Sequence, residues 1–81
     1  MYKVIGIKNI NYTSKAGHPV KGVELHVTHE DKRVEGVAVD TIFVSDRTVV
    51  ESGYYVEELQ GATLTPLYNK YGKIERIELN K

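Results

Sequence analysis

The residues best suited to catalysis or metal binding are three histidines and a few close carboxylates. His26 and His29 are three residues apart, a spacing that suits a metal site on a helix but points to opposite sides of a strand. No third ligand stands near them. Ser45-Asp46-Arg47 has no histidine close by and lacks the glycine-flanked turn that presents a nucleophilic serine. We therefore expect no enzyme, no metal and no cofactor.

Binding to a polyanion suits the charge distribution better. The net charge is zero, yet residues 1–23 hold four lysines and no acid, and residues 61–81 hold four bases and two acids. Residues 24–60 hold nine acids and three bases. If the two ends meet in space, one face is positive; otherwise the charges form a scattered, solvated surface.

Aromatic rings lie among the cations at both ends. Lysines contact phosphates, and tyrosine rings stack on bases for roughly 1–3 kcal/mol each. For Tyr68, at a strand end, packing against the core competes with stacking, whereas Tyr71 lies within a turn that has little core to reach. The candidate nucleic-acid-binding residues are Tyr12, Lys15, His18, Lys21, Tyr68, Lys70, Tyr71, Lys73 and Arg76.

The elements that must position these residues are mostly strands. Short runs rich in Val, Ile, Thr and Tyr, divided by Gly, Asn, Asp and Ser, predict five strands. A change of phase between Ile5/Ile7 and Ile10/Tyr12 predicts a bend near Lys8–Asn9. The expected strands cover residues 2–12, 20–28, 34–44, 62–68 and 73–79.

Three details refine this pattern. Val37, Val39 and Phe43 share one face of the third strand. Residues 54–60 suit a short helix ended by Gly61. Pro66 indicates that the fourth strand is an edge or interrupted strand.

The order of elements predicts a single mostly β domain over residues 1–81. It favours a five-stranded OB-fold-like barrel with a short helical or irregular segment between strands 3 and 4. An SH3-like barrel is the competing architecture. The opening residues have neither the apolar run of a signal peptide nor the length of a membrane span, and cysteine is absent. We expect a soluble, cytoplasmic protein of a bacterial host, with no membrane or small-molecule partner.

Two short motifs resemble those of a known family. Gly17-His18-Pro19, between Lys15 and Lys21, is similar to a basic hairpin tip, and Tyr71-Gly72 followed by Ile74-Glu75-Arg76 is similar to a late aromatic-glycine hairpin. Both resemble the single-stranded DNA-binding gene V proteins of filamentous bacteriophages and similar small proteins of bacterial mobile elements. Val20 departs from the family, which usually has a stacking tyrosine there.

The resemblance implies an OB-type barrel and a symmetric homodimer that coats single strands with little sequence preference. By the same resemblance, Lys15, Lys21 and Arg76 would contact phosphate and Tyr71 would stack. We therefore expect a single-stranded DNA-binding protein that coats or protects a replication intermediate of a phage or mobile element, with RNA as a further possibility. The alternative is a small β-barrel that binds a protein, by strand addition at the Pro66 edge or through acidic residues 24–60.

Overall fold

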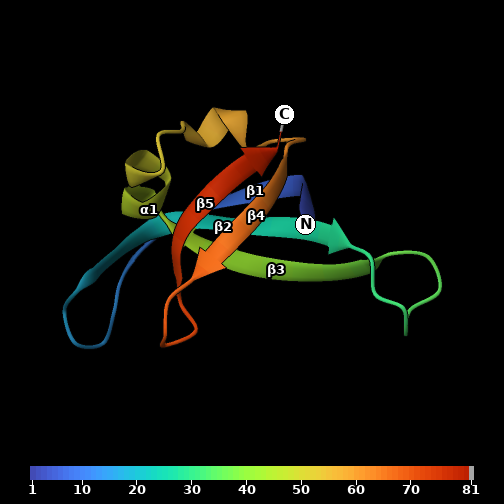
Figure 1. Ribbon diagram of the computed structural model, residues 1–81. Coiled ribbons are helices and arrows are strands. Elements are labelled where there is room, and N and C mark those ends of the chain that lie inside the picture. Colours follow the sequence, from blue (N-terminus) through green and yellow to red (C-terminus); the bar gives the residue numbers. More distant parts are fainter. Residues whose placement is uncertain (81) are drawn as a thin grey trace.

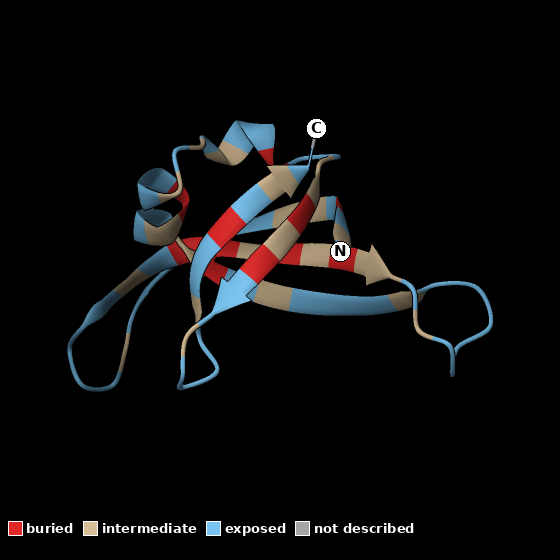
Figure 2. Cartoon of the chain, viewed as in Figure 1, coloured by how far each residue is buried: buried red, intermediate tan, exposed pale blue. Residues whose placement is uncertain are grey.

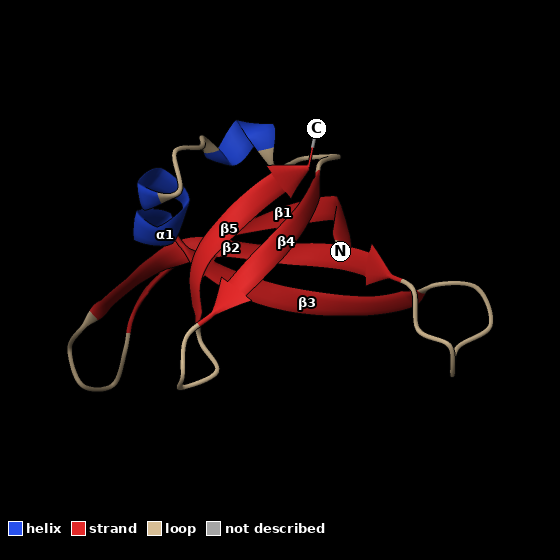
Figure 3. Ribbon diagram, viewed as in Figure 1, coloured by secondary structure: helices blue, strands red, loops and turns tan. Residues whose placement is uncertain are grey.

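The computed structural model describes residues 1–80 and consists mainly of strands (Figures 1 and 3). Helical structure is confined to the connection between the third and fourth strands, as the sequence predicted. The elements in chain order are β1 (Tyr2–Thr13), β2 (Pro19–His29), β3 (Ala38–Ser45), α1 (Asp46–Glu51), the 3₁₀ turn η1 (Val56–Glu58), β4 (Thr63–Tyr68) and β5 (Ile74–Asn80).

All five strands belong to one antiparallel sheet with the order β3-β2-β1-β4-β5. The long β1 pairs with β2 along most of its length and with β4 only at Tyr2↔Leu64 and Lys3↔Thr63. Because β1 and β4 share so little, the β4–β5 ribbon swings across the β1-β2-β3 part of the sheet (Figure 1). The prediction of five strands is confirmed, and the structure adds that the first strand pairs with both the second and the fourth.

Closure into a barrel is not seen in residues 1–80. β3 and β5 are the two edges of the sheet and do not pair with each other. β4 is an inner strand of the sheet, but at Pro66 it pairs with β5 alone, so this stretch is locally the edge or interrupted strand that the sequence predicted. Pro66 is tolerated because it lies beyond the short β1–β4 pairing, where only β5, through Ile77, pairs with β4.

The bend in β1 lies earlier than the sequence predicted. The register against β2 shifts between Val4 and Gly6, so Ile5 is the extra residue of a bulge, and pairing from Lys8 to Thr13 is regular. The bulge lets Val4 and Ile7 both face the core, while Ile5 is exposed. The isoleucine pattern correctly predicted a bend in this strand. It placed the bend at Lys8–Asn9 because Ile5 and Ile7 were assumed to share one face.

The core lies between the crossing halves of the sheet (Figure 2). Val23, Leu25 and Val27 alternate into it from β2, as predicted. Helix α1 and the segment after it cover one end, where the Ser52 hydroxyl and the Tyr54 hydroxyl accept hydrogen bonds from β5 at 3.0 and 3.2 Å. The buried apolar side chains are Val4, Val23, Leu25, Val27, Val44, Val49, Leu59, Leu64 and Ile77.

The connections around β3 differ from expectation. β3 begins at Ala38 and not at residue 34, because Asp31 accepts the Arg33 amide in a tight turn. α1 lies ahead of the predicted residues 54–60, which hold only η1. Ser45 begins α1 by accepting the Thr48 amide at 3.2 Å, an N-cap that the sequence reading overlooked.

A close approach between β2 and β3 requires glycine at position 22. A Cβ atom added there would lie 2.5 Å from both Cζ of Phe43 and the carbonyl oxygen of Val44. Those separations are well inside van der Waals contact, and one of the obstructing groups is backbone. Gly22 therefore lets the Phe43 ring lie across β2.

We predict that Gly22→Ala lowers the free energy of unfolding by about 1–3 kcal/mol, since the added methyl group displaces Phe43 or the β3 backbone. The matched control is Gly6→Ala, because a Cβ atom there meets only ordinary contact, 3.6 Å from Cβ of His26. Urea denaturation of both variants measures the difference. Equal stabilities would contradict the proposed crowding at Gly22.

Candidate nucleic-acid interface

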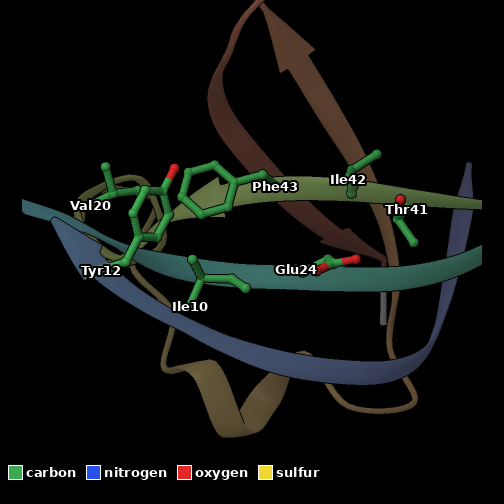
Figure 4. Close-up of a pocket in the computed structure, with 7 residues that line it drawn as sticks. All are labelled: Ile10, Tyr12, Val20, Glu24, Thr41, Ile42 and Phe43. Carbon is green, nitrogen blue, oxygen red and sulfur yellow. The ribbon is translucent and has the colours of Figure 1, made fainter. Parts of the chain in front are cut away.

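The outward side of β1, β2 and β3 carries an exposed cluster of apolar side chains, which we call the aromatic face. Register places Ile10 opposite Gly22 and Tyr12 opposite Val20, while Phe43 pairs with Glu24. The Phe43 ring points along the sheet toward the Tyr12 ring (Figure 4). Together they border an open hollow of about 350 Å³, lined by Ile10, Tyr12, Val20, Glu24, Thr41, Ile42 and Phe43.

Phe43 is the most informative residue that the sequence reading missed as a site candidate. Its shared face with Val39 is as predicted, but that face is turned to solvent: Phe43 is 45% exposed, and the core residue of this strand is Val44. Val44 is the feature that could have indicated this orientation, because it is an apolar neighbour of Phe43 on the opposite face of the strand. It pairs with buried Val23. Because neighbouring residues of a strand face opposite sides, burying Val44 leaves the Phe43 ring exposed.

The two hairpin tips, residues 14–18 and 69–73, have the same backbone construction. In each tip, the amide of the first residue donates to the carbonyl oxygen of the fifth, and the side-chain oxygen of the first residue accepts the amide of the fifth. The amide of the glycine at the fourth position donates to the carbonyl oxygen of the first residue at 2.9–3.0 Å. Gly17 and Gly72 have φ near +80°, a conformation that only glycine adopts easily. Ser14-Lys15-Ala16-Gly17-His18 thus matches Asn69-Lys70-Tyr71-Gly72-Lys73 position by position.

This shared construction presents a basic side chain at the second and fifth residues of each tip. Lys15 and His18 are exposed at one tip, and Lys70 and Lys73 at the other. Tyr71 stands where the first tip has Ala16, is 74% exposed, and has the Lys70 Nζ 5.2 Å from its ring centroid. Both tips extend to the same side of the sheet, away from α1 (Figure 1).

The β4–β5 tip adjoins the aromatic face. A second hollow is lined by Ile42, Phe43 and Ser45 from β3 together with Tyr68, Gly72, Lys73 and Ile74. Ile42 and Phe43 border this hollow and the first one alike. The two hollows share Ile42 and Phe43 at the unpaired edge of β3, and we call the two together, from Tyr12 to Tyr68 and Lys73, the groove.

Tyr68 has a mixed environment within this groove. Its side chain is half exposed, and partial burial, followed by the neighbouring Tyr2 hydroxyl and the Asp40 carboxylate, raises the pKa of the Tyr68 phenol. Tyr68 lines the second hollow, between β3 and the β4–β5 tip.

Of the nine candidate residues, Tyr12, Tyr68 and Lys73 line the two hollows and the other six do not. Lys15, His18, Lys70 and Tyr71 are exposed on the hairpin tips, and Lys21 and Arg76 lie on strands. Lys21 follows Val20 and precedes Gly22, so its side chain leaves β2 on the side opposite the aromatic face. Arg76 is exposed on β5 opposite Leu67, next to buried Ile77, and faces away from the core. Neither cation lines either hollow of the groove.

Other chemistry is sparse in the part of the chain that the structure describes. His26 Nε2 lies 3.8 Å from Glu24 Oε1, and residues 1–80 contain no group of three or more possible metal ligands. Within the same residues, no helix has both the length and the apolar character needed to span a membrane.

The chain matches no family model, no curated protein and no solved structure. The likeness of its two hairpin motifs to those of the gene V proteins stays a prediction.

We predict that Asn69→Ala loosens the tip at residues 69–73. The Asn69 Oδ1 accepts the Tyr71 and Lys73 amides at 2.9 and 3.1 Å, and losing this acceptor costs about 0.5–1.5 kcal/mol per hydrogen bond. The amide hydrogens of Tyr71 and Lys73 should then exchange faster in NMR measurements. Asn69→Asp keeps the acceptor and is the control; unchanged exchange in Asn69→Ala would contradict the assigned role.

Proposed function

We propose that this protein binds single-stranded nucleic acid through the groove between the aromatic face and the β4–β5 tip. The observation that carries the proposal is the position of Phe43, which borders both hollows and so joins Tyr12 to Tyr68 and Lys73. Rings with exposed faces beside lysines are what an unpaired strand requires, because its bases stack while its phosphates pair with cations.

The strand order supports an OB-like fold for this function. An OB barrel pairs its first strand with the second and the fourth, and binds ligands on the faces of strands 2 and 3 and on the loops between strands 1–2 and 4–5. The order β3-β2-β1-β4-β5 has these pairings, leaving β3 and β5 unpaired within residues 1–80. The aromatic face and the two hairpin tips occupy the corresponding positions.

The proposed binding depends little on sequence and does not by itself separate DNA from RNA. Every base has a face that stacks, so Tyr12, Phe43 and Tyr71 accept any of them. Discrimination between the polymers needs a contact with the 2′-hydroxyl group. By the resemblance of its tips, we assign the protein to coating or protecting DNA replication intermediates of a phage or mobile element.

A homodimer belongs to the same proposal, and the helical segment after β3 offers apolar residues for its contact. Of Val49, Val50 and Tyr54, Val49 is buried in the core and Tyr54 accepts the Leu79 amide. Val50 and Tyr55 are the exposed apolar residues of this segment. They are the candidates for a contact between two copies.

A protein-binding module is the second candidate. The sheet edges β3 and β5 are both unpaired among the described residues, and an unpaired edge can accept a strand from a partner. Strand addition would therefore occur at β3 or β5, because β4 with Pro66 is an inner strand. Absence of oligonucleotide binding at low salt would favour this function over the first.

We predict that Tyr71→Ala weakens binding to a labelled oligo-dT by about 5- to 150-fold, the effect of losing one stacked ring. Fluorescence anisotropy measures the change, and circular dichroism checks the fold. Val37→Ala is the control, because Val37 is 56% exposed, lies in the loop between β2 and β3, and lines neither hollow. If Tyr71→Ala binds as tightly as the parent, Tyr71 does not stack.

We predict that binding weakens with salt and that removing tip lysines reduces this dependence. If Lys15, Lys70 and Lys73 each neutralise one phosphate, the slope of log affinity against log salt is about −2 for a single strand. Lys15→Ala with Lys70→Ala should bring the slope to about −0.7. Lys32→Ala, in the loop between β2 and β3, should leave the slope unchanged. Equal slopes in all three proteins would rule out phosphate contacts at Lys15 and Lys70.

A further inference from the structure

Glu24 is the one charged residue that lines the hollow of the aromatic face. It lies directly opposite Phe43 on β3 and opposite Lys8 on β1. A carboxylate is unexpected where a phosphate chain is proposed to pass, because like charges repel. Its place among exposed rings indicates a role other than phosphate contact.

The Glu24 carboxylate has spare hydrogen-bonding capacity. Within residues 1–80 its carboxylate has one side-chain partner, His26, whose Nε2 lies 3.8 Å from Glu24 Oε1, too far for a hydrogen bond. Lys8, although opposite in the ladder, forms no ion pair with it in the same residues. An ionised carboxylate has two oxygens that only accept hydrogen bonds. A ligand that fills the hollow can therefore satisfy Glu24 by donating to it.

The Phe43 ring determines where such a ligand would lie. The ring lies over Gly22, the second residue before Glu24 on the same side of β2. Figure 4 shows the Glu24 carboxyl group beside the Phe43 strand and the Tyr12 ring beyond the Phe43 ring. A flat base stacked on the exposed rings would have its edge, and not its face, next to the carboxylate.

Among the common bases, guanine alone presents two adjacent donors, N1–H and the 2-amino group, on its Watson–Crick edge. These two donors match the two oxygens of one carboxylate, and hydrogen bonds to an ionised acceptor are about twice as strong as neutral ones. Thymine offers one N–H between two carbonyl oxygens, which a carboxylate repels. Cytosine and adenine offer an amino group beside a ring nitrogen that accepts.

We propose that Glu24 reads guanine, and that a strand bound in the groove is held most tightly where a guanine occupies the aromatic face. This inference rests on the proposed binding of single strands, and it adds a local base preference to a contact that otherwise tolerates any sequence. Stacking and the tip lysines supply the general affinity, and Glu24 supplies the discrimination.

The test compares three labelled strands of about eleven nucleotides, a length within the site size of a single OB-like domain. One is all thymidine, the second has a central guanosine and the third a central inosine, which lacks only the 2-amino group. Anisotropy titrations of the parent protein should show at least about five-fold tighter binding for the guanosine strand than for the thymidine strand. The inosine strand should fall between the two.

Glu24→Gln keeps the shape of the side chain but removes the charge and one acceptor. It should reduce the guanosine preference to less than about two-fold, while affinity for the thymidine strand stays equal or rises because repulsion of phosphates is lost. Glu35→Gln, in the exposed loop between β2 and β3, removes the same charge and should keep the preference.

The outcomes separate the two proposals. No binding of any strand at low salt overturns the proposed function. Equal binding of the guanosine and thymidine strands by the parent overturns only the role of Glu24. The same holds if inosine equals guanosine, or if Glu24→Gln keeps the full preference.

Discussion

The antiparallel pairing of β1 with β2 is the interaction on which the rest of the structure depends. It runs from Lys3↔Thr28 to Thr13↔Pro19 and is interrupted only by the bulge at Ile5. One side of this ribbon contributes Val4, Val23, Leu25 and Val27 to the core, and the other side holds Ile10 and Tyr12 beside Val20. Since side chains alternate, a slip of one residue in this ladder would exchange the core with the aromatic face.

The groove exists because the sheet stays open and two strands approach closely. Gly22 lets the Phe43 ring cross from β3 onto β2, and the missing β3–β5 pairing leaves space where β3 faces the β4–β5 tip. Closing that gap with backbone hydrogen bonds would bring β5 onto the edge that now borders Tyr68 and Lys73. The same opening borders the candidate site and leaves the β3 edge unpaired. Because an unpaired edge can accept a strand from a partner, protein binding remains the alternative function.

Zero net charge conceals a spatial separation of charge. The two matching tips carry Lys15, His18, Lys70 and Lys73 on one side of the sheet, whereas Asp46, Glu51 and Glu57 belong to the helical segment on the other (Figure 1). A polyanion approaching this molecule meets attraction at the tips and repulsion at the helical end. In the proposed function this separation would orient a bound strand across the groove, with Glu24 as an acid within the aromatic face itself.

The sequence by itself determined the local features: the number of strands, the inward row of β2, the two glycine turns and the basic character of their tips. These follow from alternation, turn chemistry and charge, which act between near neighbours in the chain. Only the tertiary structure decided where β1 bulges, that β3 and β5 remain unpaired, and that Phe43 faces outward to join Tyr12 with the β4–β5 tip. Those outcomes depend on contacts between residues far apart in sequence, such as Gly22 with Phe43 and Val4 with Val27, which no single segment encodes.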